Sequence, residues 1–177
     1  MPRLTKTALQ KHLQHLDKEE LIAEMVRLFG KFKMVNEHFQ MEYGDDTREV
    51  VDAYKQKIRK AYFSNRRIRR PRTASVKKLI AEFKKVALFE YDTIDLLLYR
   101  VENSIEFAHV NGYMSEAFYK SILSAFTEAV QLIAKNNAWG EFKVRCEKCI
   151  WHAGELEAGL NYAMQDIFDI QFAGKLL

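Results

Sequence analysis

The sequence contains few residues that interrupt helices or cross-link a chain. Only two of its 177 residues are proline and seven are glycine, so it lacks the turn residues that an all-β protein needs. Two cysteines are too few for a disulfide scaffold, and a reducing cytosol would keep them as thiols. No segment approaches the roughly 20 consecutive apolar residues of a membrane span, and the first residues lead into no apolar signal region. We therefore expect a cytoplasmic protein that contacts no membrane.

Apolar residues recur at helical spacing along most of the chain. The sequence is 48% hydrophobic and 12% aromatic, which is too apolar for a disordered chain and sufficient for one core at this length. Asp17 and Glu20 form a capping-box pattern, and the apolar stripe that follows ends at Gly30. Similar stripes joined by short connections predict seven to nine helices. The expected fold is all-α, a single domain over residues 1–177 built as an antiparallel helical bundle or an irregular stack of helix pairs.

Basic residues are concentrated in one segment. Residues 55–78 contain eleven Lys or Arg and no Asp or Glu, whereas the rest of the chain has 17 basic and 24 acidic residues. The net charge of +4 is therefore the sum of one basic block and an acidic remainder of the chain. The residue before a proline is disfavoured in helical geometry, so Arg70 is expected in a connection at about residues 64–73, and Thr73 or Ser75 is expected to cap the next helix.

The basic block allows two interpretations. Arginine side chains in a connection can bind phosphates bidentately, and Tyr54, Tyr62 and Phe63 are near enough in sequence to offer stacking surfaces. The alternative is that the basic side chains are solvated or pair with acidic helices of the same chain, because a run of charge without a recognised motif is weak evidence for nucleic-acid binding. The candidate residues for binding a polyanion are Arg66, Arg67, Arg69, Arg70, Arg72, Lys77 and Lys78.

Cys146 and Cys149 form a C-x-x-C pattern, with His152 three residues further on. A structural zinc site normally requires four ligands, usually from two such pairs, and no second pair exists. The cysteines also fall on an apolar helical face, where cysteine is most often buried. We therefore interpret them as inert core thiols.

Glu106 and His109 form a Glu-x-x-His pattern, and Glu102 lies one helical turn earlier. A di-iron bundle needs a second copy of this pattern and a further Glu, and neither is present. The sequence also has no G-x-S-x-G motif and no glycine-rich phosphate loop. We predict no catalytic residue, no metal site and no cofactor, although carboxylates such as Glu102 and Glu106 could act as acid and base in an enzyme.

Several short segments carry a family resemblance: residues 16–22, 31–33 with Phe39, 57–63, 101–107, 116–121, 135–137 and 142–146. Together they resemble an uncharacterised bacterial family, domain of unknown function 6155. A Gly-Trp-Gly-Phe-His-Asp-like run near the end of that family is replaced here by residues 159–164, which removes its one histidine-containing segment. The resemblance implies a helical domain over most of the chain and carries no activity or site residues.

Two functions fit these observations. The first is a non-enzymatic helical interaction module that binds a protein partner or a second copy through exposed positions such as Tyr99, Tyr113, Trp139 and Trp151. The second is binding of nucleic acid or another polyanion through the block Lys55 to Lys78, largely without sequence specificity and driven by counterion release.

Overall fold

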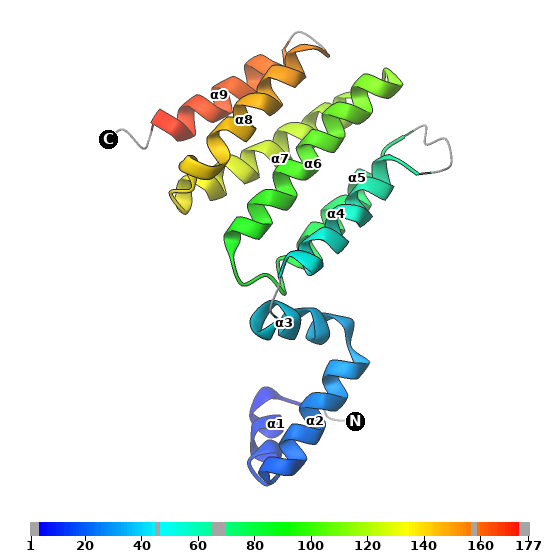
Figure 1. Ribbon diagram of the computed structural model, residues 1–177, viewed down its shortest axis with the longest axis vertical. Helices are drawn as coiled ribbons and strands as arrows, with labels where there is room; N and C mark the ends of the chain where they lie inside the picture. Colours follow the sequence, from blue (N-terminus) through cyan, green and yellow to red (C-terminus); the bar gives the residue numbers. More distant parts are fainter. Residues whose placement is uncertain (1–3, 45–46, 65–69, 157–158, 174–177) are drawn as a thin grey trace.

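The computed structural model describes residues 4–44, 47–64, 70–156 and 159–173, and all regular structure within them is helical (Figure 1). The prediction of an all-α fold with seven to nine helices is confirmed. The helices are α1 (Lys6–Leu13), α2 (Lys18–Lys31), α3 (Lys33–Tyr43), α4 (Arg48–Tyr62), α5 (Thr73–Phe83), α6 (Glu90–Asn111), α7 (Glu116–Lys135), α8 (Trp139–Gly154) and α9 (Leu160–Ala173). None of these helices combines the length and apolar character that crossing a membrane requires.

The body of the molecule consists of α4 to α9, stacked as three helix pairs (Figure 1). The pairs are α4 with α5, α6 with α7, and α8 with α9, and each pair packs against the next. Helix α6 lies at the centre and contacts α4, α5, α7 and α8. The consecutive residues Leu96, Leu97 and Leu98 are all fully buried, which is the pattern of a helix covered on several sides. Of the two predicted architectures, the stack of helix pairs is therefore the one observed.

A side-chain cap defines the start of α2 as the sequence predicts. The backbone N–H of Glu20 donates to Asp17 Oδ1 at 2.8 Å, and the N–H of Asp17 donates to Glu20 Oε2 at 3.0 Å, which completes the capping box of α2. Ser115 Oγ likewise accepts from the N–H of Phe118 at 3.3 Å at the start of α7. The predicted capping box of Asp17 and Glu20 is therefore confirmed.

The predicted cap of α5 is wrong. Helix α5 begins at Thr73 itself, its N-cap residue is Arg72, and no side chain caps it. The N–H of Arg72 donates to the carbonyl oxygen of Ala61 at 3.3 Å, which attaches the connection to the end of α4 and starts the helix immediately afterwards. Thr73 and Ser75 consequently lie inside the first turn, where neither can serve as the N-cap residue.

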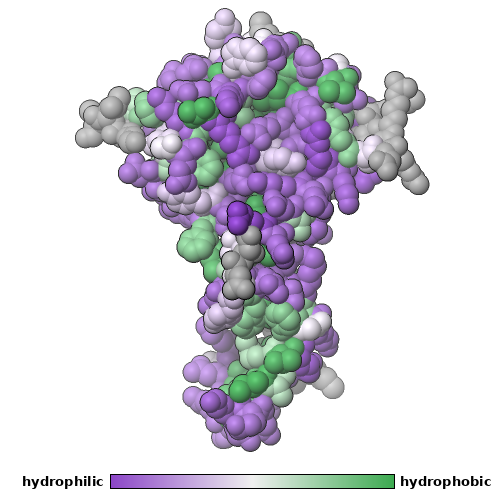
Figure 2. Space-filling view, viewed as in Figure 1, coloured by the Kyte–Doolittle hydropathy of each residue, from purple (hydrophilic) through white to green (hydrophobic). Residues whose placement is uncertain are grey.

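Helices α1 to α3 form an arm that projects from the body (Figure 1). Neither α1 nor α2 contains a buried residue, and α3 buries only Glu37 and Met41. At the base of the arm, the hydroxyl of Tyr54 on α4 donates to Glu37 Oε2 at 2.9 Å. Figure 2 shows apolar side chains gathered on the surface of the arm below the body.

Candidate functional site

Four of the predicted polyanion-binding residues lie at the corner where the connection enters α5. Arg70 and Arg72 precede the helix, and Lys77 and Lys78 lie on it. All four are exposed, and no ion pair or side-chain hydrogen bond with another described residue involves any of them. We call these four residues the basic corner. Arg66, Arg67 and Arg69 lie outside the residues that the structure describes.

Three of the four basic residues that α4 contributes to the block, Lys55, Lys57 and Arg59, are paired with acids of the same chain. Lys55 Nζ lies 2.6 Å from Asp95 Oδ2, and Arg59 Nη2 donates to Glu106 Oε1 at 2.6 Å. Arg59 Nη1 also donates to Asn103 Oδ1 at 2.9 Å. The two interpretations of the block thus apply to different parts of it: α4 contributes basic residues that bind α6, and the corner at α5 contributes basic residues that face solvent.

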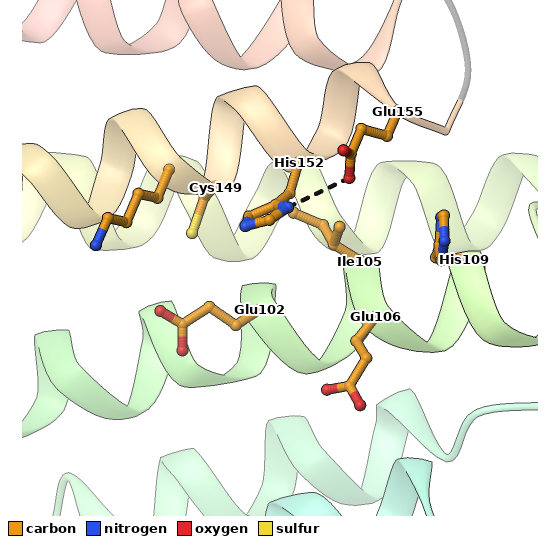
Figure 3. Close-up of a pocket in the computed structure, with 8 residues that line it drawn as sticks. Glu102, Ile105, Glu106, His109, Cys149, His152 and Glu155 are labelled. Carbon is orange, nitrogen blue, oxygen red and sulfur yellow. Dashed lines mark hydrogen bonds and ion pairs between the residues drawn. The ribbon is translucent and has the colours of Figure 1, made fainter.

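A groove of about 400 Å³ lies between α6 and α8 (Figure 3). It brings together the two patterns that the sequence analysis considered separately, the Glu-x-x-His of α6 and the C-x-x-C with its histidine on α8. The sequence offers no signal for this meeting, because it depends on the packing of helices that are not consecutive. The residues that line the groove are Glu102, Ile105, Glu106, His109, Lys148, Cys149, His152 and Glu155.

Most of the carboxylates of this groove are already paired. Arg145 Nη2 donates to Glu102 Oε2 at 2.9 Å, and the same guanidinium also binds Asp95. In Figure 3 the carboxylate of Glu106 points away from α8, in keeping with its ion pair to Arg59 on α4. Among the described residues, no group of three or more His, Cys, Asp or Glu is placed to hold a metal ion. The groove therefore brings ligand-type residues of α6 and α8 together, with two of its carboxylates held by arginines.

The two cysteines are free, buried thiols, as predicted. Burial raises the pKa of Cys146 to about 12 and also raises the pKa of Cys149. The thiolate is the reactive form, so a raised pKa makes both residues poor nucleophiles and poor metal ligands. Their position on the inner face of α8 supports a packing role.

The arm carries a row of exposed apolar side chains on α2, which we call the ridge. Its members are exposed to the following fractions: Leu21 36%, Ile22 53%, Met25 46% and Val26 64%. Beside the ridge lies a hollow of about 160 Å³, lined by Met25, Val26, Phe29 and Phe39. The rings of Phe29 and Phe39 meet edge to face with centroids 6.2 Å apart and hold α2 against α3.

The sequence analysis predicted exposed aromatic positions outside α2, and the structure bears out only part of that prediction. Trp151 is exposed, Tyr99 and Tyr113 are half-buried, and Trp139 is buried with its ring 5.4 Å from that of Phe168. Trp139 is therefore a core residue and the prediction for it is wrong. The sequence shows the apolar stripe of α2, but periodicity alone does not indicate whether another helix covers an apolar stripe.

Comparisons with known proteins give one match. No curated protein and no solved structure matches the chain. The model of a family of unknown function, DUF6155, matches residues 4–163, which is most of the chain and includes the arm and most of the body. The chain therefore belongs to the DUF6155 family.

Proposed function

We infer that this protein is a helical interaction module rather than an enzyme, and that its arm is the surface that binds a partner. The observation that carries this inference is the ridge, whose four large apolar side chains are all exposed on one helix. A group of exposed apolar side chains on a folded protein commonly marks an interaction site. The partner that suits such a surface is a helix with an apolar face, which packs along the ridge.

The stability of the arm supports the same inference. Helices shorter than about 12–15 residues are marginal in water unless they pack against something. Helix α1 has 8 residues, α2 has 14, and neither buries a side chain within the described part of the chain. Covering the ridge would supply the apolar burial that these helices lack, at roughly 25 cal/mol per Å².

The inference can be tested without knowing the partner. A photo-reactive amino acid is placed at Val26 on the ridge or, as the control, at Val144 on α8, which is 60% exposed on the body. After irradiation of cells that express the full chain, we expect one defined cross-linked product from position 26 and none from position 144. Equal cross-linking at both positions, or none at position 26, would contradict the inference.

A second candidate function is the binding of nucleic acid or another polyanion at the basic corner. One observation favours it: Arg70, Arg72, Lys77 and Lys78 have no acidic partner among the described residues, although Lys55, Lys57 and Arg59 of α4 do. Arginine and lysine side chains that remain free in this way can replace the counterions of a phosphate backbone. Such binding would be largely independent of sequence, because contacts to phosphates carry no base information.

The second candidate is tested by fluorescence anisotropy with labelled single-stranded DNA, duplex DNA and RNA at several salt concentrations. We expect binding at low salt that weakens as salt rises, and a shallower salt dependence when all four residues of the basic corner are changed to Ser. The control changes four exposed lysines elsewhere to Ser and alters the net charge equally: Lys6, Lys11, Lys120 and Lys148. Undetectable binding at low salt, or equal effects of the two variants, would exclude the corner as the site.

A further inference from the structure

The groove between α6 and α8 is large enough to hold a small molecule. Its volume of about 400 Å³ lies within the range of about 300–1,000 Å³ that is usual for ligand pockets. The two buried side chains that line it, Ile105 of α6 and Cys149 of α8, are apolar. In Figure 3 the Cys149 thiol and the His152 ring extend from α8 toward α6. Ligand pockets commonly combine an apolar lining with a few polar groups, so this lining suits a ligand with an apolar body.

Two of the carboxylates that line the groove already have arginine partners in the chain. Arg145 donates to both oxygens of Glu102, from Nε to Oε1 at 2.5 Å and from Nη2 to Oε2 at 2.9 Å. Arg59 of α4 pairs with Glu106 in the same bidentate manner. These two negative charges are therefore compensated within the protein, and they do not call for a cationic ligand.

Two basic side chains of α8 can contact one anion at the groove. Lys148 and His152 are four residues apart, so their side chains are neighbours on the helix. Lys148 is exposed and forms no ion pair or side-chain hydrogen bond with another residue in the described part of the chain. His152 Nδ1 donates to Glu155 Oε2 at 3.3 Å, which orients the ring and leaves Nε2 as the nitrogen that donates to an anion when the imidazole is protonated.

We propose that this groove binds a small organic anion, with the carboxylate of the ligand on Lys148 and His152 and its apolar body against Ile105 and Cys149. The charge of the lining selects an anion, because the arginine-bound carboxylates are neutralised and the ammonium of Lys148 is not. None of these residues belongs to the arm. Binding at the groove and binding at the arm therefore stand or fail independently.

The test is a titration of the purified full chain with 2-naphthoate, an aromatic carboxylate, followed by two-dimensional amide NMR. The titration extends to about 10 mM, because ligands of this size bind weakly. We expect saturable shifts of the amides of α6 and α8 that line the groove. 2-Naphthamide has the same rings without the charge and should bind about 3- to 10-fold more weakly. Inorganic phosphate has the charge without an apolar body and should not displace 2-naphthoate.

Substitutions locate the site on α8. Lys148→Met and His152→Gln should each weaken the binding of 2-naphthoate by about 3- to 10-fold, because neither new side chain can carry a positive charge. The matched control is Lys120→Met, which removes an exposed lysine of α7 outside the groove and should leave the dissociation constant unchanged. All three positions are exposed, so circular dichroism should show the same helix content for every variant.

Four results would overturn the assignment of the groove as an anion site. They are the absence of saturable shifts, shifts confined to α2 of the arm, equal affinities for 2-naphthoate and 2-naphthamide, and equal effects of Lys148→Met and Lys120→Met. Shifts confined to α2 would place the probe on the ridge, which leaves the proposed role of the arm intact while excluding the groove.

Discussion

The hydroxyl of Tyr54 donates a hydrogen bond of 2.9 Å to Glu37 Oε2, and this contact joins the arm to the body. Both residues are buried. The ring of Tyr54 packs edge to face against Phe83 of α5 with centroids 5.1 Å apart, while Lys57 Nζ lies 4.2 Å from the centre of the same ring. A buried polar contact therefore contributes to the position of the arm. The Glu37 carboxylate also pairs with Lys33 on its own helix and with Lys57 on α4, so its charge is compensated while Tyr54 supplies the donor to Oε2.

Tyr54→Phe should lower the free energy of unfolding by about 1–3 kcal/mol, because the Glu37 carboxylate loses its buried hydroxyl donor. Urea denaturation followed by circular dichroism measures this change. The control is Tyr162→Phe, whose hydroxyl lies on an exposed side chain of α9, and it should change the value by less than about 0.5 kcal/mol. Equal effects of the two substitutions would show that the hydrogen bond between α3 and α4 contributes nothing.

The helices were predictable because their signals are local. Asp17 with Glu20, and Ser115 before α7, form caps within four residues of chain, and the apolar stripes repeat every three or four residues. The partner of each stripe was not predictable in this way. Leu21, Ile22, Met25 and Val26 follow the same spacing as Ala125, Phe126, Ala129 and Val130 of α7, yet the second set is buried and the first is exposed. Periodicity shows that a face is apolar, but only the tertiary packing shows whether it is covered.

The candidate sites also depend on tertiary packing, which is why the sequence alone did not predict their composition. The meeting of Glu102 with Cys149 depends on α6 and α8 lying side by side although α7 separates them in the sequence. The division of the basic block depends on α6 presenting Asp95 and Glu106 to α4. Charge counts along the chain detect the block but cannot assign its partners, because opposite charges far apart in sequence meet only after the helices pack.

The buried thiols should react slowly in the folded protein. Because burial raises the pKa of Cys146 to about 12 and also raises that of Cys149, almost all of both thiols stays protonated at pH 8. The thiolate fraction of Cys146 should be about a thousandfold or more below that of an unperturbed cysteine of pKa ~8.5.

Reaction with a thiol-specific disulfide reagent should proceed at the rate of opening of the folded state. It should become rapid and complete, with two thiols per chain, in concentrated guanidinium. A rapid reaction of either cysteine under native conditions would contradict the assignment of both as core residues.

The capping box of α2 should stabilise the arm and leave the body unaffected. Asp17→Ala removes the side chain that accepts from the N–H of Glu20, at a cost of about 0.5–2 kcal/mol in helix stability. Since α2 buries no side chain, the loss should appear as faster amide hydrogen exchange in α2 with unchanged exchange in α6 and α7. Lys18→Ala is the control, because Lys18 lies beside the cap without taking part in it. Uniformly faster exchange throughout the protein would indicate that the arm and body unfold together.

Arg145 should be among the more important charged residues of the body, because it connects α8 to two carboxylates of α6. It donates to Glu102 Oε2 at 2.9 Å and to the carbonyl oxygen of Asp95 at 3.3 Å, and it also forms an ion pair with the Asp95 carboxylate. Arg145→Met retains most of the side-chain volume and leaves both half-buried carboxylates without this partner. We expect it to lower the free energy of unfolding by about 1–3 kcal/mol.

The control for Arg145→Met is the loss of an exposed ion pair, which should lower the free energy of unfolding much less. Lys120 pairs with Glu116 within α7 at the surface, so Lys120→Met should cost less than about 0.5 kcal/mol in the same urea titration. Asp95 keeps its ion pair with Lys55, so if the unpaired Glu102 carboxylate causes the cost of Arg145→Met, adding Glu102→Gln should recover part of the lost stability. A double variant no more stable than Arg145→Met would show that the unpaired Glu102 carboxylate does not cause the lost stability.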